Sequence, residues 1–207
     1  MAYPHFNRSQ EGHKLTLNQN VGGVAVINPT IRPIQEYSPD DIERTINLNA
    51  RFMMLATRRL MPVLVRNGPS LILNLSSASR MGMPGLAPYS ACKAFVLIFS
   101  KSTAREMRTS HSPVDILAIV AGDVESQQNS IALTPGTPSS RRFAQAMMDR
   151  APRAVQLGRL EMAPWWLHAV QIGFLESLPE WLGQKLILQT FKEKEAAVAA
   201  FNERKLQ

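Results

Sequence analysis

The stretch from residue 70 to residue 93 constrains the fold of this chain more than any other part of the sequence. An apolar run, Leu71 to Leu75, is short, capable of forming a β-strand and followed directly by Ser76-Ser77, so it predicts a buried strand. A loop rich in glycine and proline comes next. Pro88 then suits the first turn of a helix, because proline has a fixed φ and needs no N–H there. The sequence therefore predicts a strand, a loop and a helix that begins at about Tyr89.

Tyr89 and Lys93 stand four residues apart, and residues at that spacing share one face of a helix. The loop can bring Ser76-Ser77 beside them, which would place a hydroxyl, a phenol and an ammonium together. A phenol with a pKa of about 10 is a poor acid or base at neutral pH, and a nearby cation favours its ionised form. The set is typical of a proton-transfer site, although a lone Tyr-x-x-x-Lys is more often a pair of exposed residues on an ordinary helix.

The whole pattern of strand, Asn-x-Ser-Ser, Gly/Pro loop, Tyr-x-x-x-Lys and apolar helix resembles the short-chain dehydrogenase/reductase family. Residues 46–49 and 89–96 are most similar to its 3-ketoacyl-CoA reductase and 17β-hydroxysteroid dehydrogenase branch, and the likeness covers roughly residues 21 to 190. In the family a serine thirteen residues before the tyrosine holds the substrate carbonyl, which implies Ser76 here. The second serine of such a pair usually has that role, so Ser77 remains an alternative. The resemblance implies an α/β, Rossmann-like fold with a three- to four-stranded, mainly parallel sheet flanked by helices.

A helix is predicted from Ser38, as N-cap, to about Arg66, with proline and acidic residues in its first turn. Asn49 lies inside the apolar stripe of this helix, whereas Asn47 shares the opposite face with arginines. Asn49 also stands twenty-seven residues before Ser76, where the family has a fourth active-site residue that holds a water connected to the lysine. We therefore expect Asn49 in the site, although a buried asparagine satisfied by the backbone is the plainer interpretation. The stripe consists of Ile42, Ile46, Met53, Ala56 and Leu60.

The chain is predicted to form a single domain with four parts. Residues 1–20 are irregular, apart from an alternation at 14–17 that favours an edge strand. Residues 21–125 form the remnant of a Rossmann core with strands at 21–28 and 114–120, residues 126–160 form a lid that caps the substrate, and residues 161–207 form C-terminal helices. A lone histidine, His168, is interpreted as structural, and the tryptophans as core packing rather than membrane contact. Apolar side chains near the expected pocket favour a hydrophobic substrate: Met81, Met83, Phe143, Met147, Trp165 and Trp166.

The sequence departs from the family where the cofactor would bind. None of the eleven glycines has the Gly-x-x-x-Gly-x-Gly spacing with which the family cradles a dinucleotide pyrophosphate at a helix N-terminus. The turn at Asn28-Pro29 lacks an N–H and a flexible glycine, and Ala121-Gly122 stands where the family has Pro-Gly. We therefore expect an N-terminally truncated fold that binds no cofactor, with NADP as the alternative.

Three functions are compatible with these observations. The preferred hypothesis is a cofactor-independent, non-redox enzyme in which Tyr89, Ser76 and Lys93 hydrogen-bond the carbonyl of a hydrophobic enone. Such donors would promote isomerisation, cyclisation or cycloaddition, with about 2.7–4 kcal/mol of transition-state stabilisation from each. The alternative is an NADP-dependent 3-ketoacyl or hydroxysteroid reductase that is incomplete as given. The second alternative is a non-catalytic dimerisation partner of an intact homologue.

Composition and charge exclude several other classes. The formal net charge is +7, but the basic residues are dispersed without stacking aromatics, so no nucleic-acid partner is expected. Cys92 is the only cysteine, which excludes an internal disulfide and a cysteine zinc cluster, and we expect no metal. No apolar run of about 18 residues and no signal peptide are found, which favours a cytoplasmic protein. The apolar helix after Tyr89 is expected to pair with a second subunit, as in the family's dimers, to give a homodimer.

Overall fold

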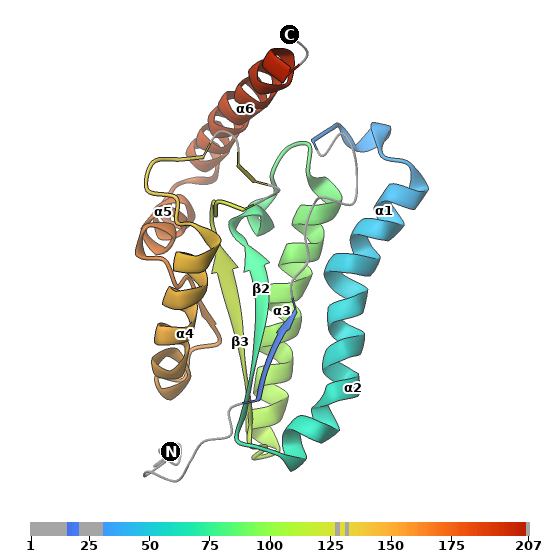
Figure 1. Cartoon of the computed structure of the whole chain (residues 1–207), viewed down its shortest axis with the longest axis vertical. Coiled ribbons are helices and arrows are strands. Elements are labelled where there is room, and N and C mark those ends of the chain that lie inside the picture. The colour runs from blue at the N-terminus through green and yellow to red at the C-terminus, as the bar shows by residue number, and fades with distance from the viewer. Residues whose placement is uncertain (1–15, 21–30, 127–128, 131–132, 206–207) are drawn as a thin grey trace.

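A parallel four-stranded sheet runs through the centre of the computed structural model, which describes residues 16–20, 31–126, 129–130 and 133–205 (Figure 1). Its strands lie in the order β1-β2-β3-β4 and every neighbouring pair is parallel. The predicted α/β, Rossmann-like class is therefore confirmed. The strands are β1 (Thr16–Asn20), β2 (Ser70–Ser77), β3 (Val114–Ala121) and β4 (Glu161–Met162).

Strand β1 pairs along β2 from Thr16 opposite Ser70 to Asn20 opposite Asn74. It forms the edge strand that the alternation at 14–17 favours. The expectation that the rest of this segment is irregular is therefore wrong for residues 18–20. The pairing covers backbone groups of β2 that would otherwise form an open sheet edge. The strand predicted at 21–28 and the turn at Asn28-Pro29 lie outside the described residues.

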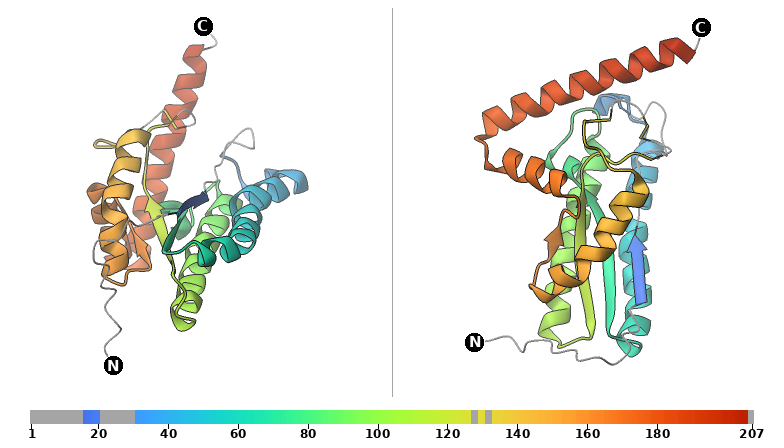
Figure 2. Two further views of the ribbon diagram at one scale, coloured as in Figure 1. Left: turned by 60° about the horizontal axis from the view of Figure 1, so that its bottom comes forward. Right: turned by 60° about the vertical axis from the view of Figure 1, so that its left-hand side comes forward.

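Helices cover both faces of the sheet, which explains why β2 and β3 are apolar on both sides (Figures 1 and 2). Helices α2 (Phe52–Arg66) and α3 (Ala87–Thr109) pack on one face, where Leu64 contacts the cluster around Ile72. Helix α4 (Ser140–Gln156) covers the other face with Phe143 and Met147. These two side chains belong to the buried core, so their expected place in a substrate pocket is wrong.

The first long helix is interrupted, contrary to the prediction of one helix over 38–66. Helix α1 (Pro39–Ile46) begins where Ser38 Oγ accepts a hydrogen bond from the Asp41 N–H at 3.1 Å, as predicted. A π-helical turn, η2 (Asn47–Arg51), then connects α1 to α2. The wider turn rotates the buried face, so the stripe predicted through Ile46 and Leu60 is wrong there: both are exposed. The predicted burial of Asn49 and Met53 is confirmed, and the other buried positions are Thr45, Ala50, Thr57 and Leu64.

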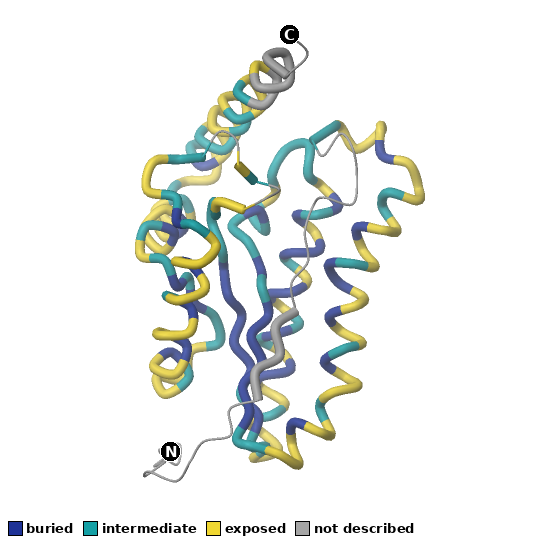
Figure 3. Tube along the Cα trace, viewed as in Figure 1, coloured by how far each residue is buried: buried dark blue, intermediate teal, exposed yellow. Residues whose placement is uncertain are grey.

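Two further helices, α5 (Trp166–Ser177) and α6 (Glu180–Lys205), follow β4. Helix α6 runs across the end of the molecule at which β2 and β3 terminate (Figure 2, right). Burial is concentrated in the strands and in the sides of the helices that face them (Figure 3). Trp166 and Trp181 are 59% and 69% exposed, so the expectation that the tryptophans pack in the core is wrong for both. Within the described residues, no helix is long and apolar enough to cross a membrane.

Candidate active site

The two serines at the end of β2 point to opposite faces, because side chains alternate along a strand. Ser76 Oγ donates a hydrogen bond to the Lys93 carbonyl oxygen at 2.7 Å and is buried, so this hydroxyl ties β2 to α3. Ser77 Oγ accepts from the Ser79 N–H at 3.2 Å, at the start of the 3-10 turn η3 (Ala78–Met81), and also hydrogen-bonds the Tyr89 side chain. Ser77, rather than the preferred Ser76, therefore lies beside the tyrosine. The serine beside the tyrosine thus stands twelve residues before Tyr89, and not thirteen as the resemblance implied.

Tyr89 stands in the first turn of α3, directly after Pro88, as the sequence predicts. Burial raises the pKa of Tyr89 to about 12, and the hydrogen bond with Ser77 opposes that effect only in part. Lys93 therefore does not bring the pKa of the phenol below its ordinary value in this structure. Lys93 Nζ lies over the ring, 5.4 Å from its centroid, and loss of hydration prevails. Tyr89 is therefore protonated at neutral pH and able to donate a proton.

Lys93 lies one helical turn after Tyr89 and is only 3% exposed. Its Nζ donates a hydrogen bond to the Leu75 carbonyl oxygen at 2.9 Å, so the side chain points to the carboxyl end of β2. Burial lowers the pKa of Lys93 to about 8. The ammonium form still prevails at neutral pH, and it places one buried positive charge next to the Tyr89 ring.

Asn49 is buried in the π-helical turn η2, whereas Asn47 is exposed, as the stripe predicts. Asn49 Nδ2 donates to the Thr45 carbonyl oxygen at 3.1 Å, and the buried Cys92 thiol of α3 approaches the same oxygen at 3.8 Å. The turn therefore packs against the helix that bears Tyr89 and Lys93. Single π-helical turns are frequent at functional sites, which accords with a role for Asn49. Its connection to Lys93 through a water stays a prediction.

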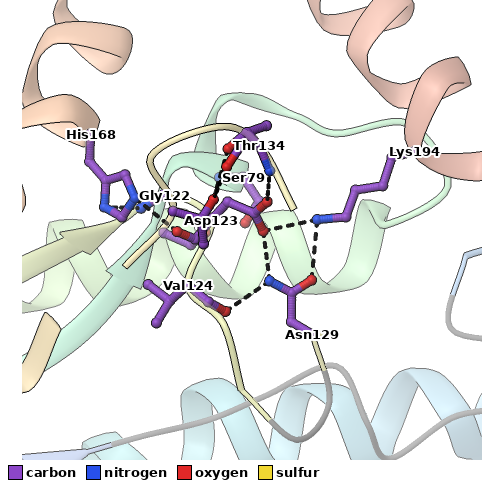
Figure 4. Close-up of polar contacts among 10 residues, drawn as sticks. Ser79, Gly122, Asp123, Val124, Asn129, Thr134, His168 and Lys194 are labelled. Atoms are coloured by element: carbon purple, nitrogen blue, oxygen red, sulfur yellow. Dashed lines mark hydrogen bonds and ion pairs between the residues drawn. The ribbon is translucent and has the colours of Figure 1, made fainter. Parts of the chain in front are cut away.

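A second polar cluster lies just beyond β3 and was not predicted from the sequence (Figure 4). The Asp123 carboxylate accepts hydrogen bonds from Asn129 Nδ2 at 2.6 Å, the Thr134 N–H at 3.2 Å and Lys194 Nζ at 3.0 Å. Burial alone would raise the pKa of Asp123, but the combined effect of these donors is larger, so the pKa is lowered. Lys194 also donates to Asn129 Oδ1 at 3.2 Å. This lysine of the predicted C-terminal helices thus fastens α6 to the end of the sheet.

His168 closes the same turn from α5 (Figure 4). Its Nδ1 accepts from the Gly122 N–H at 3.1 Å, and its Nε2 donates to the Asp123 carbonyl oxygen at 2.9 Å. Burial lowers the pKa of His168, so the ring is neutral, and the structural interpretation is confirmed. A Cβ on Gly122 would lie 2.6 Å from the ring, which explains why glycine stands there.

Ser77, Tyr89 and Lys93 thus meet at the carboxyl ends of parallel strands, where open α/β sheets bind their ligands. A protonated phenol beside a hydroxyl and a buried ammonium is chemically suited to proton transfer to or from a carbonyl or alcohol oxygen, and here it lies on a Rossmann-like fold. Residues 14–133 match the family model described as short chain dehydrogenase. The chain belongs to the short chain dehydrogenase family, as the resemblance implied.

Proteins with described activities are similar to part of this chain. A 2-dehydro-3-deoxy-L-rhamnonate dehydrogenase (NAD(+)) from Sphingomonas sp. (strain SKA58) is 30% identical over 132 residues, which are 62% of this chain and 47% of the relative. A very-long-chain 3-oxoacyl-CoA reductase from Pyricularia oryzae is 26% identical over 139 residues, 66% of this chain and 41% of the relative. The chain therefore spans less than half the length of these relatives.

Solved structures agree on the fold. A short chain dehydrogenase from Burkholderia cenocepacia in complex with NADP superposes with a TM-score of 0.67 at 21% identity, over 83% of this chain and 68% of that one. A structure from work on 7β-hydroxysteroid dehydrogenase stereoselectivity also gives 0.67, at 16% identity, over 84% of this chain and 66% of that one. At such identities the likeness establishes the fold alone.

Proposed function

We propose that this chain provides the proton-transfer and carbonyl-binding part of an oxidoreductase that interconverts a carbonyl and an alcohol on an apolar acyl substrate with NADP or NAD. The observation that carries the proposal is the hydrogen bond of the protonated Tyr89 with Ser77, together with the buried Lys93 Nζ over the Tyr89 ring. The relatives are named dehydrogenases and reductases, and several are very-long-chain 3-oxoacyl-CoA reductases. The net charge of +7 suits the anionic phosphates of a coenzyme A thioester.

The residues of this chain fit the reacting end of a nicotinamide dinucleotide. The chemistry of the donor set is the ground for this fit: a phenol, a hydroxyl and an ammonium at one sheet edge. When bound, the dinucleotide would supply or accept the hydride. No glycine-rich turn in this sequence fits the pyrophosphate, and we assign no residue of the chain to that group.

The three side chains would act on the substrate oxygen as follows. Hydrogen bonds from Ser77 and Tyr89 hold a ketone oxygen, and the Tyr89 O–H proton passes to that oxygen as negative charge develops on it. The raised pKa of about 12 keeps the phenol protonated until then. The buried Lys93 ammonium next to the ring stabilises the phenolate that remains. Proton transfer of this kind contributes about 10²–10⁴-fold to a rate.

The preferred hypothesis from the sequence, a cofactor-independent isomerase or cyclase, gains no support from the comparisons. That hypothesis rested on the absence of a glycine-rich turn for the dinucleotide pyrophosphate. Such a turn binds the cofactor and does not react with the substrate. The site itself contains the groups that an alcohol–ketone interconversion needs, so its alternative, the reductase, is the better supported function.

The experiment is a titration of the folded chain with NADPH and with NADH, followed by nicotinamide fluorescence, and then a turnover assay with 3-oxoacyl-CoA thioesters. We expect micromolar binding of one nucleotide and ketone reduction that Tyr89→Phe lowers by about 10²–10⁴-fold without loss of folding. Tyr37→Phe is the matched control, because its hydroxyl donates to the Gly85 carbonyl oxygen at 2.9 Å and not to a group of the proposed site. Absence of binding up to millimolar nucleotide by a monodisperse, folded chain would contradict the proposal.

We further propose that the chain forms a homodimer through the outer face of α2 and α3. Phe52, Leu55 and Ile98 are 59%, 48% and 62% exposed there. A hollow of about 540 Å³ lies between α3 and the helices α1 and α2, lined mostly by apolar side chains that include Ile46, Met54 and Phe95. Exposed apolar side chains gathered on one face commonly mark an interaction site, and a second copy of the same face would cover them.

A further inference from the structure

Helix α5 exposes a stripe of large apolar side chains away from the sheet. Trp166, Val170 and Phe174 are 59%, 58% and 56% exposed, and their spacing of four places them along one side of the helix. The opposite side is anchored in the protein, since His168 and Ile172 are buried. The one carboxylate of α5, Glu176, is paired with Arg80 at 2.7 Å. The stripe is therefore apolar and carries no free acidic group.

Helix α6 also exposes large apolar side chains, and lysines lie among them. From Trp181 to Lys192 the sequence contains two lysines and no carboxylate. Trp181 and Leu188 are 69% and 49% exposed, and Lys185 and Lys192 fall on the same side of the helix. The other side faces the protein, because Phe191 lies close to Gly85 in the loop before Tyr89. One side of this half of α6 is thus packed on the protein and the other is left to solvent.

We propose that these exposed residues form a membrane-contact face that lies on an anionic lipid surface. The α5–α6 face consists of Trp166, Val170, Phe174, Trp181, Lys185, Leu188 and Lys192. Protein–protein interfaces are depleted in lysine, whereas helices at a lipid surface combine tryptophan and other large apolar residues with lysines that extend to the headgroups. The two lysines and the absence of carboxylates match the negative charge of such a surface.

The face is connected to the site through the helices that bear it. Helix α6 reaches Asp123 and Asn129 through Lys194, and α5 reaches the same turn through His168 (Figure 4). Contact with lipid would therefore hold the carboxyl end of the sheet close to the membrane. An apolar acyl substrate would dissolve in that membrane. This consequence rests on the proposed function, whereas the proposal of membrane contact is independent of it.

The test uses the full chain and vesicles of phosphatidylcholine, alone or mixed with phosphatidylserine. Two of the three tryptophans, Trp166 and Trp181, lie on this face, whereas Trp165 packs against the core, so intrinsic tryptophan emission reports mainly on the face. We expect vesicles that contain phosphatidylserine to bind the chain in flotation and to shift the emission to shorter wavelength. Phosphatidylcholine alone should bind it about 30-fold more weakly, because each lysine near an anionic surface adds about fivefold in affinity.

Matched pairs of variants separate the face from general effects. Lys185→Gln with Lys192→Gln should lower binding about 30-fold, whereas Arg141→Gln with Arg142→Gln, which removes the same charge from α4, should change it less than about threefold. Trp166→Ser with Phe174→Ser should lower binding at least about tenfold, and Met148→Ser with Leu157→Ser, exposed on α4 and directly after it, should not.

Three results would overturn the proposal. The first is that the folded wild-type chain binds neither kind of vesicle. The second is binding that the α4 variants reduce as much as the α5–α6 variants do. The third is that Trp166→Ser with Phe174→Ser dissociates an oligomer while vesicle binding is unchanged, which would make the face a protein interface. None of these measurements depends on nucleotide or turnover, so failure of the proposed reaction would leave this test intact.

Discussion

At the scale of single residues, the serine pair tests which hydroxyl takes part in the proposed reaction. Ser77→Ala removes the group beside Tyr89 and should lower the rate of ketone reduction by about 10²–10³-fold, the usual effect of losing one donor to a developing oxyanion. Ser76→Ala removes the bond to the Lys93 carbonyl and should instead lower the free energy of unfolding by about 1 kcal/mol, with most activity retained. Urea unfolding and steady-state rates of both variants check this. The reverse pattern would return the role to Ser76.

Lys93 makes a second prediction at this scale, through pH. Burial lowers its pKa from 10.5 to about 8 in the folded chain, so between these pH values the unfolded chain binds more protons. Stability contributed by this group therefore increases as the pH rises from about 8 towards 10.5. The rate of reduction should fall over the same rise, because the ammonium beside Tyr89 is lost.

Denaturation and rates measured across that range, for wild type and for Lys93→Met, check both effects. Lys93→Met should remove the increase in stability with pH, leaving the opposite effects of Cys92 and Tyr89, whose pKa values burial raises. Lys101→Met, at a half-buried lysine of α3 that pairs with Glu161, should preserve the increase. A Lys93→Met chain that keeps the increase would show that another group titrates.

At the scale of elements, His168 joins α5 to the end of β3 and predicts sensitivity to acid. Its folded-state pKa is below 6.5, so its contribution to stability is present above pH 6.5 and is lost as the pH falls through the folded pKa. His168→Ala should lower the free energy of unfolding by about 2–5 kcal/mol, because it leaves the Gly122 N–H and the Asp123 carbonyl unpaired and opens a cavity. Thermal unfolding between neutral and mildly acidic pH measures both. His111→Asn, at an exposed histidine, should change neither quantity.

At the scale of the whole molecule, the proposed dimer predicts how the chain behaves in solution. Ile98→Glu places a charge at the centre of the apolar face of α2 and α3, and burial of an unpaired charge costs about 3–5 kcal/mol. The dimer dissociation constant should therefore rise by about 100-fold or more. Light scattering over a dilution series measures it, with Leu157→Glu at the end of α4 as the control. A wild-type chain that stays monomeric when concentrated would contradict the dimer.

The sequence alone determined the order of the central elements. The strand ending in Ser76-Ser77, the helix start at Pro88 and Tyr89, the capped start at Ser38 and the strand from Val114 are all confirmed. These features depend on local chemistry, namely apolar runs, proline and capping side chains, which few residues are enough to specify. The spacing of Tyr89 and Lys93 and the burial of Asn49 follow from helix periodicity in the same way.

Only the tertiary structure decided which groups meet. Whether Ser76 or Ser77 faces Tyr89 depends on the length and path of the loop between them, and the pKa of Tyr89 depends on how deeply that loop and α3 bury the ring. The bond between Asp123 and Lys194 joins residues 71 positions apart, so no local pattern could indicate it. The exposure of Trp166 and Trp181 follows from where α5 and α6 pack, because an apolar helix has the same composition whether its second side meets protein, lipid or water.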